Sequence, residues 1–272
     1  MHSLVDAHVH LQPAFSVECF LDSAAANVRA AAQHLRLDGR VVGCLLLADD
    51  ADFSQFHRLR DEGALAAWRI EPTGEPTSLE ARHMGDPRMP TLTIVAGRQV
   101  ITAERLEVLA VNTLAPLADG QPFETAVRHV VAATGQAVVP WGFGKWLGPR
   151  ARLVRHAIDT ARDGELRLGD NAHRPTTIPD PSLFRHARRH GLPILPGSDP
   201  LPLPEEVCCP ACYGFTVPGE LDGDTPGHAL ASRLREMQDQ PRPFGQRKSL
   251  LAAMQCQTRL RAGGASLFHL AG

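Results

Sequence analysis

Short apolar runs alternate with amphipathic stretches rich in Ala, Leu and Arg along most of this 272-residue chain. Such alternation is typical of repeated strand–helix units, whose strands pair in parallel. We expect helices that include Ala24–Leu35, Phe123–Ala133, Arg150–Arg162 and Ser182–His190. The expected strands are Leu4–Val9, Val41–Leu47, Thr91–Val95, Glu107–Val111, Ala137–Trp141, Arg167–Asp170 and Pro193–Pro196, with Ala64–Ile70 as an eighth candidate.

This order of elements predicts an α/β fold, a TIM-like (β/α) barrel of seven or eight strands in one domain. A closed barrel is favoured over an open sheet because no glycine-rich phosphate fingerprint follows the first strand and polar residues recur at strand ends. Residues 1–226 form the predicted barrel, and residues 227–272 form a helical extension packed on its outside. Two irregular stretches, Glu71–Pro90 and Pro200–Pro226, are expected to be loops.

Composition narrows the class of protein. Apolar residues make up 43 % and charged residues 21 %, which is ordinary globular usage. The net charge of -2, without a basic run, argues against nucleic acid as a partner. Leu4–Val9 lacks the features of a secretion signal, and no segment reaches the roughly 18 apolar residues of a membrane span. We therefore expect a cytoplasmic protein with no membrane partner.

Three of the six cysteines gather in the run Cys208–Cys212. These spacings do not indicate a disulfide framework. Cys209 and Cys212 would supply half of a structural zinc site, for which His228 and Cys256 are the later candidates. Reduced loop thiols are the alternative that we favour.

The strongest signal for chemistry is Asp6-Ala7-His8-Val9-His10, at the end of the first expected strand. Strand residues two apart point the same way, so His8 and His10 can share one divalent ion. The alternative is a histidine that only hydrogen bonds at the strand end. Two histidines in register make that interpretation the weaker one.

Later strand ends carry further polar residues. Asp199 follows a late strand, where it is our candidate metal ligand and general base, although Asp before Pro is also ordinary turn chemistry. His173 is a candidate third imidazole ligand and catalytic residue; taken alone, it would be a surface loop residue. Arg174 beside it is a candidate for binding an anionic substrate group.

Two other cations are candidates for substrate binding. Lys145 lies in Trp141–Trp146, where glycines permit close backbone approach and the ammonium offers a point charge for phosphate or carboxylate. A tight loop with a solvated lysine is the alternative. Arg98 faces either the predicted barrel mouth or solvent.

In their order, these motifs resemble those of the polymerase-and-histidinol-phosphatase superfamily and, more distantly, the amidohydrolases. The matching segments are Asp6–His10 for the opening HxH, Val95–Thr102 with Leu106–Val111 for the middle strands, Asn171–Pro175 for the Ala-His-Pro turn and Gly197–Asp199 for the closing Gly-Ser-Asp. The resemblance spans about residues 4 to 200. It implies a metal-bearing β/α barrel and cleavage of phosphate esters.

Several positions depart from the family pattern. Leu47–Asp52 lacks the histidine of a Thr-Asp-His motif, Gln99 replaces the bridging carboxylate, and Glu107 replaces a histidine. Pro200-Leu201 stands where a further histidine is expected. A neutral amide binds hard cations more weakly than a carboxylate, so these departures argue against a second ion.

The ligands that remain are His8, His10, His173 and Asp199, with Gln99 as a weaker one. They predict one divalent ion, zinc, iron or manganese, that activates a water molecule while Asp199 accepts its proton. The sequence therefore predicts a metal-dependent hydrolase of a small, anionic molecule, foremost a phosphoesterase. Hydrolysis of a C–N bond or a lactone, and a degenerate barrel that only binds or scaffolds, are the alternatives.

Overall fold

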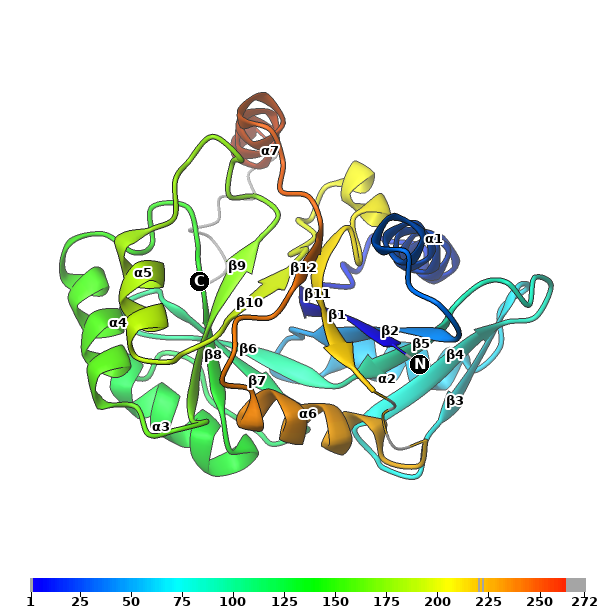
Figure 1. Cartoon of the computed structure of the whole chain (residues 1–272), viewed down its shortest axis with the longest axis horizontal. Coiled ribbons are helices and arrows are strands. Elements are labelled where there is room, and N and C mark those ends of the chain that lie inside the picture. Colours follow the sequence, from blue (N-terminus) through cyan, green and yellow to red (C-terminus); the bar gives the residue numbers. More distant parts are fainter. Residues whose placement is uncertain (1, 220, 222, 263–272) are drawn as a thin grey trace.

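The computed structural model describes residues 2–219, 221 and 223–262, whose strands form two open, mixed sheets (Figure 1). Among these residues, the first sheet has seven strands, in the spatial order β12 (Pro243–Gly245), β11 (Tyr213–Pro218), β1 (His2–Val9), β2 (Val41–Leu47), β5 (Thr91–Val95), β4 (Ser78–His83) and β3 (Trp68–Pro72). The second sheet, in the same described part, has five, in the order β10 (Ile194–Gly197), β9 (Leu166–Asn171), β8 (Ala137–Pro140), β7 (Glu107–Val111) and β6 (Gly97–Ile101).

The helices pack on the outer sides of the two sheets. Those beside the first sheet are α1 (Val17–Leu35) and α2 (Ser54–Glu62), and those beside the second are α3 (Phe123–Thr134), α4 (Gly148–Thr160) and α5 (Ser182–Arg189). The later chain adds the 3₁₀ segment η1 (Pro204–Cys208), α6 (Pro226–Glu236) and α7 (Leu250–Ala262). None of the described helices is both long and apolar enough to cross a membrane.

The central strands of the first sheet are largely apolar because both of their faces are buried. In β1, Leu4 packs in the apolar cluster beside α1, whereas Val5 packs in the cluster shared by the two sheets. Leu109 and Leu195 bring the second sheet into that shared cluster. A strand covered on both faces shows a continuous apolar run rather than an alternation, which is the pattern of Val41–Leu47.

The predicted closed barrel is wrong, because the strands form two open sheets that contain antiparallel pairs. Thr91–Val95 and Glu107–Val111 were expected as strands of a parallel barrel, but the chain forms β6 between them and turns back directly into β7, which pairs with it antiparallel. An antiparallel pair needs only a short turn, whereas a parallel pair needs a long crossover. The region from Trp68 to Val111 is therefore a series of hairpins, which cannot continue a repeated strand–helix barrel.

The other expected helices and strands are confirmed within about two residues, except that α1 begins at Val17 rather than Ala24, but two loop predictions are wrong. Glu71–Pro90 contains the end of β3 and all of β4, and Pro200–Pro226 contains η1 and β11. Ala64–Ile70 becomes a strand only from Trp68 onward. The predicted helical extension holds α6 and α7 together with β12, which pairs with β11; its last residues, 263–272, lie outside the described part.

The two sheets approach each other closely at two glycines. A Cβ on Gly97 would stand 2.3 Å from the Leu47 carbonyl oxygen, and a Cβ on Gly197 would stand 2.6 Å from the His8 nitrogen. Neither distance admits a side chain, so glycine is the residue that allows the backbones to touch. The contact at Gly197 brings the end of β10 against the end of β1.

Candidate metal centre

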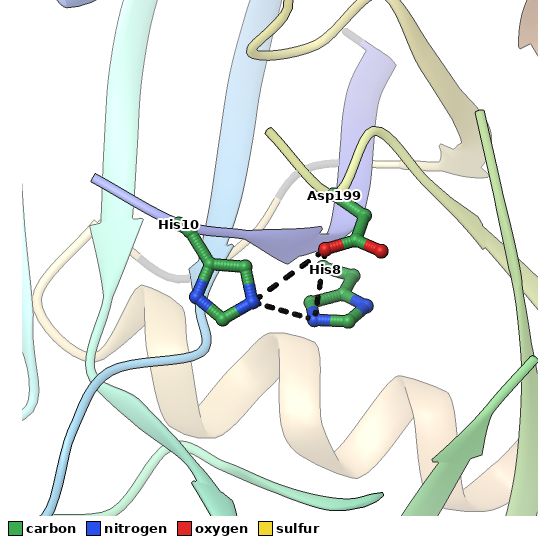
Figure 2. Close-up of side chains that lie close together, drawn as sticks. All are labelled: His8, His10 and Asp199. Carbon is green, nitrogen blue, oxygen red and sulfur yellow. Dashed lines mark hydrogen bonds and ion pairs between the residues drawn. The ribbon is translucent and has the colours of Figure 1, made fainter. Parts of the chain in front are cut away.

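Two imidazoles meet at the C-terminal end of β1 (Figure 2). The Nε2 atoms of His8 and His10 are 3.0 Å apart. His8 is 3 % exposed, whereas the His10 side chain is 20 % exposed. The structure thus brings these two predicted ligands together at a point that solvent can reach from the His10 side.

Asp199 supplies a carboxylate to the same point. It follows β10 with a left-handed φ of 51°, and its N–H donates to the His8 carbonyl oxygen at 2.8 Å. This backbone contact between the sheets places Asp199 Oδ1 3.6 Å from the Nε2 atoms of both His8 and His10. The second oxygen, Oδ2, accepts a hydrogen bond of 2.9 Å from Asn171, whose amide also donates to the Trp141 carbonyl oxygen.

The spacing of these three ligand atoms matches one metal ion. The circle through His8 Nε2, His10 Nε2 and Asp199 Oδ1, which stand 3.0, 3.6 and 3.6 Å apart, has a radius of about 2.0 Å, the length of a zinc–nitrogen bond. Gln99 Oε1 lies 3.2 Å from His8 Nε2 and adds a neutral oxygen. The donor set of two imidazoles, one carboxylate and one amide oxygen suits zinc or iron.

Burial keeps the His10 ring neutral, which is the form that binds metal. Desolvation, followed by the electrostatic interaction with the nearby His8 ring, lowers the pKa of His10 to about 4. Burial alone would raise the pKa of Asp199, but the nearby His8, His10, His173 and Lys145 hold it below its usual range. At neutral pH the site therefore presents a lone pair at His10 and a carboxylate at Asp199.

Asp6, two residues before His8, fixes the geometry of the site but is not one of its candidate ligands. Its carboxyl accepts hydrogen bonds from the backbone N–H groups of His8, Ser198 and Ala211 and from the Ser198 hydroxyl. Burial raises the pKa of Asp6 to about 6. Asp6 therefore ties β1 to the segments that follow β10 and η1, and so fixes the relative position of His8 and Asp199.

Comparison with known proteins supports the fold alone. No protein-family model matches this chain, and no curated protein sequence matches it. A solved structure, PsfC from Pseudomonas syringae PB-5123, aligns with a TM-score of 0.53 at 14 % identity, over 96 % of this chain and 98 % of PsfC. At this identity the likeness shows a shared arrangement of elements over nearly the full length of both chains.

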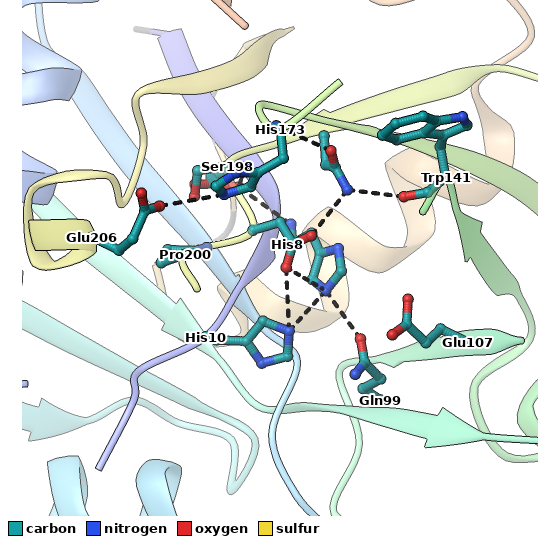
Figure 3. A network of polar contacts seen from close by, with 12 residues as sticks. His8, His10, Gln99, Glu107, Trp141, His173, Ser198, Pro200 and Glu206 are labelled. Carbon is teal, nitrogen blue, oxygen red and sulfur yellow. Dashed lines mark hydrogen bonds and ion pairs between the residues drawn. The ribbon is translucent and has the colours of Figure 1, made fainter. Parts of the chain in front are cut away.

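Lys145 and Glu107 form an ion pair beside the centre. The Lys145 ammonium donates to the Glu107 carboxylate, and both side chains are largely buried. Their charges reach the His10 ring, and Glu107 lies next to Gln99 in Figure 3. The predicted substrate-binding lysine is thus near the centre, with its charge already partnered.

His173 lies close enough to Asp199 for their charges to interact, but it is outside the group of atoms that converge, and Figure 3 shows it in contact with Glu206. Its Nε2 is 3.3 Å from Glu206 Oε2, and the other oxygen of Glu206 accepts from Lys248. Desolvation lowers the pKa of His173, but contacts with Cys256 and Glu206 and the charge of Asp199 outweigh it and raise this pKa to about 9. These contacts favour the protonated ring of His173, which supplies none of the three atoms that converge at the centre.

The two predicted arginines are committed to carboxylates. Arg174 donates from Nε and Nη2 to Asp170 at 2.6 and 2.7 Å, and it is 2 % exposed. Arg98 is 1 % exposed and pairs with Asp119 at 2.9 Å. Neighbouring strand residues point to opposite faces, so Arg98 turns away from the face that Gln99 presents.

The candidate ligands of a structural zinc do not form one group in the described residues. The Sγ atoms of Cys209 and Cys256 lie 3.7 and 3.8 Å from Lys248 Nζ, so the charged lysine side chain stands beside both thiols, where a zinc ion would otherwise bind. His228 instead bonds to the buried Glu75, at the start of α6.

Sequence reasoning missed the residues that hold the candidate site residues in place. Asn171 orients the candidate ligand Asp199, and Glu206 contacts His173 beside the centre. Asn171 was visible as a polar residue at the end of an expected strand, which is a usable signal. Glu206 lies in a segment that we predicted as a loop, and nothing in its local sequence indicates a buried carboxylate.

Proposed function

We propose that this chain is a metal-dependent hydrolase of a small molecule, with one divalent ion held by His8, His10 and Asp199. The proposal rests on the spacing of these three ligand atoms, which lets one ion stand about 2.0 Å from each of them. When bound, such an ion lowers the pKa of a water ligand to near neutrality. Gln99 offers a further oxygen to the same ion.

The residues around the ion have separate roles in this proposal. Asp199 binds through Oδ1, and Oδ2, which Asn171 orients, accepts the proton of the attacking water. His173 supplies positive charge near Asp199 and a proton for the leaving group. The partly exposed sides of His10 and Asp199 leave an approach for substrate. All six cysteines are free, which supports a reducing, cytoplasmic location.

Phosphate esters are the first substrate class to test, because Lys145 lies beside the centre and can exchange Glu107 for a phosphate oxygen. One observation favours a second class. Lys145, Arg174 and Arg98 each already pair with a carboxylate, which suits a neutral substrate better than a dianion. Hydrolysis of a C–N bond or a lactone is therefore the second candidate, and a binding protein without catalysis is the third.

The deciding experiment measures metal content and hydrolysis together. Protein purified without added metal or chelator should contain about one equivalent of zinc or iron, and His10→Ala should lose it together with any activity against a panel of phosphate esters, amides and lactones. His34→Ala, an exposed histidine on α1, is the matched control and should keep both. Full metal content in His10→Ala would show that the assigned site is wrong, and metal without hydrolysis would favour a binding protein.

A further inference from the structure

A second group of two histidines and one carboxylate lies on the surface between α4 and α5, which pack side by side (Figure 1). Its members are Asp159 in the last turn of α4, and His186 and His190 at the end of α5. One ligand atom from each residue lies within 4.8 Å of the others. None of these residues belongs to the centre at His8.

The three side chains converge on one oxygen. His186 Nε2 is 2.5 Å and His190 Nε2 is 3.5 Å from Asp159 Oδ1. The two rings, four residues apart along the chain, have centroids 4.4 Å apart. Residues four apart on a helix lie above one another on the same face, so both rings point toward α4 together.

The second nitrogen of His190 is fixed for metal binding. His190 Nδ1 donates to the His186 carbonyl oxygen at 3.0 Å, so the proton of the neutral ring sits on Nδ1 and the lone pair of Nε2 faces Asp159. Ligating histidines in metal sites are held in this way, with the other ring nitrogen donating to a carbonyl or carboxylate.

The helix ends favour a cation at this position. Asp159 stands in the last turn of α4, where the negative end of the helix dipole disfavours a carboxylate, and His186 and His190 stand at the same end of α5. A cation placed among them faces the carbonyl ends of both helices and the Asp159 charge. The site therefore offers more stabilisation to a divalent ion than the same three side chains would on a helix N-terminus.

We propose that Asp159, His186 and His190 form a second metal site, which takes a first-row transition-metal ion and ties the C-terminal ends of α4 and α5 together. Two imidazoles and one carboxylate suit Ni²⁺, Cu²⁺ and Zn²⁺, and solvent fills the remaining positions because Asp159 and His190 are exposed. The site has a structural role, since no described catalytic residue adjoins it.

Arg155 competes with the ion. Its Nη1 donates to His186 Nδ1 at 3.2 Å, and since arginine is only a donor, the His186 proton must then sit on Nε2, toward Asp159. Metal binding requires that proton to move to Nδ1, which displaces the exposed Arg155. Removing Arg155 should therefore strengthen metal binding, a result that a simple hydrogen-bonded cluster does not predict.

The test titrates NiCl₂ into the whole protein by calorimetry and follows the thermal midpoint in parallel. Compared with wild type, His190→Ala should bind one equivalent less of Ni²⁺ and lose part of the Ni²⁺-dependent rise in midpoint. His156→Ala, an exposed histidine on the same helix as Asp159, is the matched control and should behave as wild type. Arg155→Ala should bind at this site several-fold more tightly.

Equal Ni²⁺ stoichiometry in wild type and His190→Ala would overturn the proposal, as would weaker binding in Arg155→Ala. Asp159→Asn provides a second variant, because it keeps the shape of the side chain at an exposed position. Loss of metal at the His8 centre would change the stoichiometry of all variants equally, so failure of the proposed hydrolase site and failure of this one are distinguishable.

Discussion

The described residues hold two groups of two histidines and one aspartate, and they are built in different ways. At the His8 group the ligands come from two sheets whose backbones touch, and the ring nitrogens face each other. At the Asp159 group the ligands come from two surface helices, and Arg155 and the helix backbone already satisfy part of each ring. The first group is held by the fold, whereas the second is assembled from side chains that can rotate.

This difference should affect both the stability of the metal-free protein and its affinity for metal. Buried ligands cannot move away from one another, so their mutual repulsion and desolvation destabilise the metal-free fold. Exposed ligands can form hydrogen bonds instead, which lowers the gain from metal. We therefore expect changes near His8 to alter both folding and metal binding, and changes near Asp159 to alter only the surface ion.

The largest effect should follow from adding a methyl group at a point where the two sheets touch. In Gly197→Ala the new Cβ would stand 2.6 Å from the His8 nitrogen, so the backbones must separate, and we expect a loss of more than about 3 kcal/mol in the free energy of unfolding. Gly191→Ala, at a φ of 69° with open space around it, should cost only about 1–2 kcal/mol. Urea unfolding of both variants measures this, and equal losses would show that the sheets are not in firm contact.

The next largest effect should come from removing one carboxylate charge, which should lower metal affinity only in the group that loses it. Asp199→Asn should weaken metal binding at the His8 centre by about 100-fold or more, which corresponds to about 2.7 kcal/mol, because an amide is a poorer ligand and a poorer base. Asp159→Asn should leave that binding unchanged. Competition with a chelator of known affinity gives both constants, and a change in the second variant would mean that the groups are coupled.

The buried ion pair of His173 and Glu206 should show its own pH dependence. The His173 pKa of about 9 exceeds its unfolded value of 6.5, so this stabilisation is complete below pH 6.5 and is lost as the pH rises through 9. The Glu206 pKa of about 2 lies below its unfolded value of 4.5, so that part is lost as the pH falls through 2.

The pair therefore contributes fully between pH 4.5 and 6.5. Glu206→Gln should destabilise the fold by roughly 2 kcal/mol more at pH 6 than at pH 9.5. Lys248 stays charged over this range, so only the His173 part titrates. Urea unfolding at the two pH values measures the difference, and a pH-independent loss would mean that His173 is not protonated in the folded protein.

The smallest effect should come from the group that orients Asp199. Asn171→Ala removes the donor to Asp199 Oδ2, and loss of such a partner weakens metal binding by about 10-fold or more. Asn171→Asp should weaken it further despite the similar shape, because two carboxylates would face each other. If neither change alters the metal affinity, Asp199 is oriented by its backbone alone.

Periodicity was a good guide to single elements and a poor guide to their connections. The apolar run Val41–Leu47 and the spacing of His8 and His10 depend on residues close together in the chain, so both were predictable. The hairpin from β6 to β7 was not, because an apolar run has the same sequence whichever direction its neighbour runs.

The ion-pair partners of the charged residues also could not be predicted from the sequence. Arg174 is a plausible substrate ligand until Asp170, four residues earlier in the chain, is known to accept hydrogen bonds from two of its nitrogens. Lys145 and Glu107 are 38 residues apart, and only the fold brings them together. Charge at a strand end thus indicated a region where polar side chains do gather, but not which of these charges already have a partner.

The pairing of β1 with β11 has a consequence for how the protein is made. His2 stands opposite Pro218, and Asp6 bonds to Ser198 and Ala211, so the first strand is completed by residues that emerge from the ribosome some 200 positions later. Closing so long a loop is slow, and helices such as α3 and α4 form much earlier. The nascent chain therefore carries its HxH segment before the proposed binding site exists, and the proposed metal ion would be captured in one of the last steps of maturation.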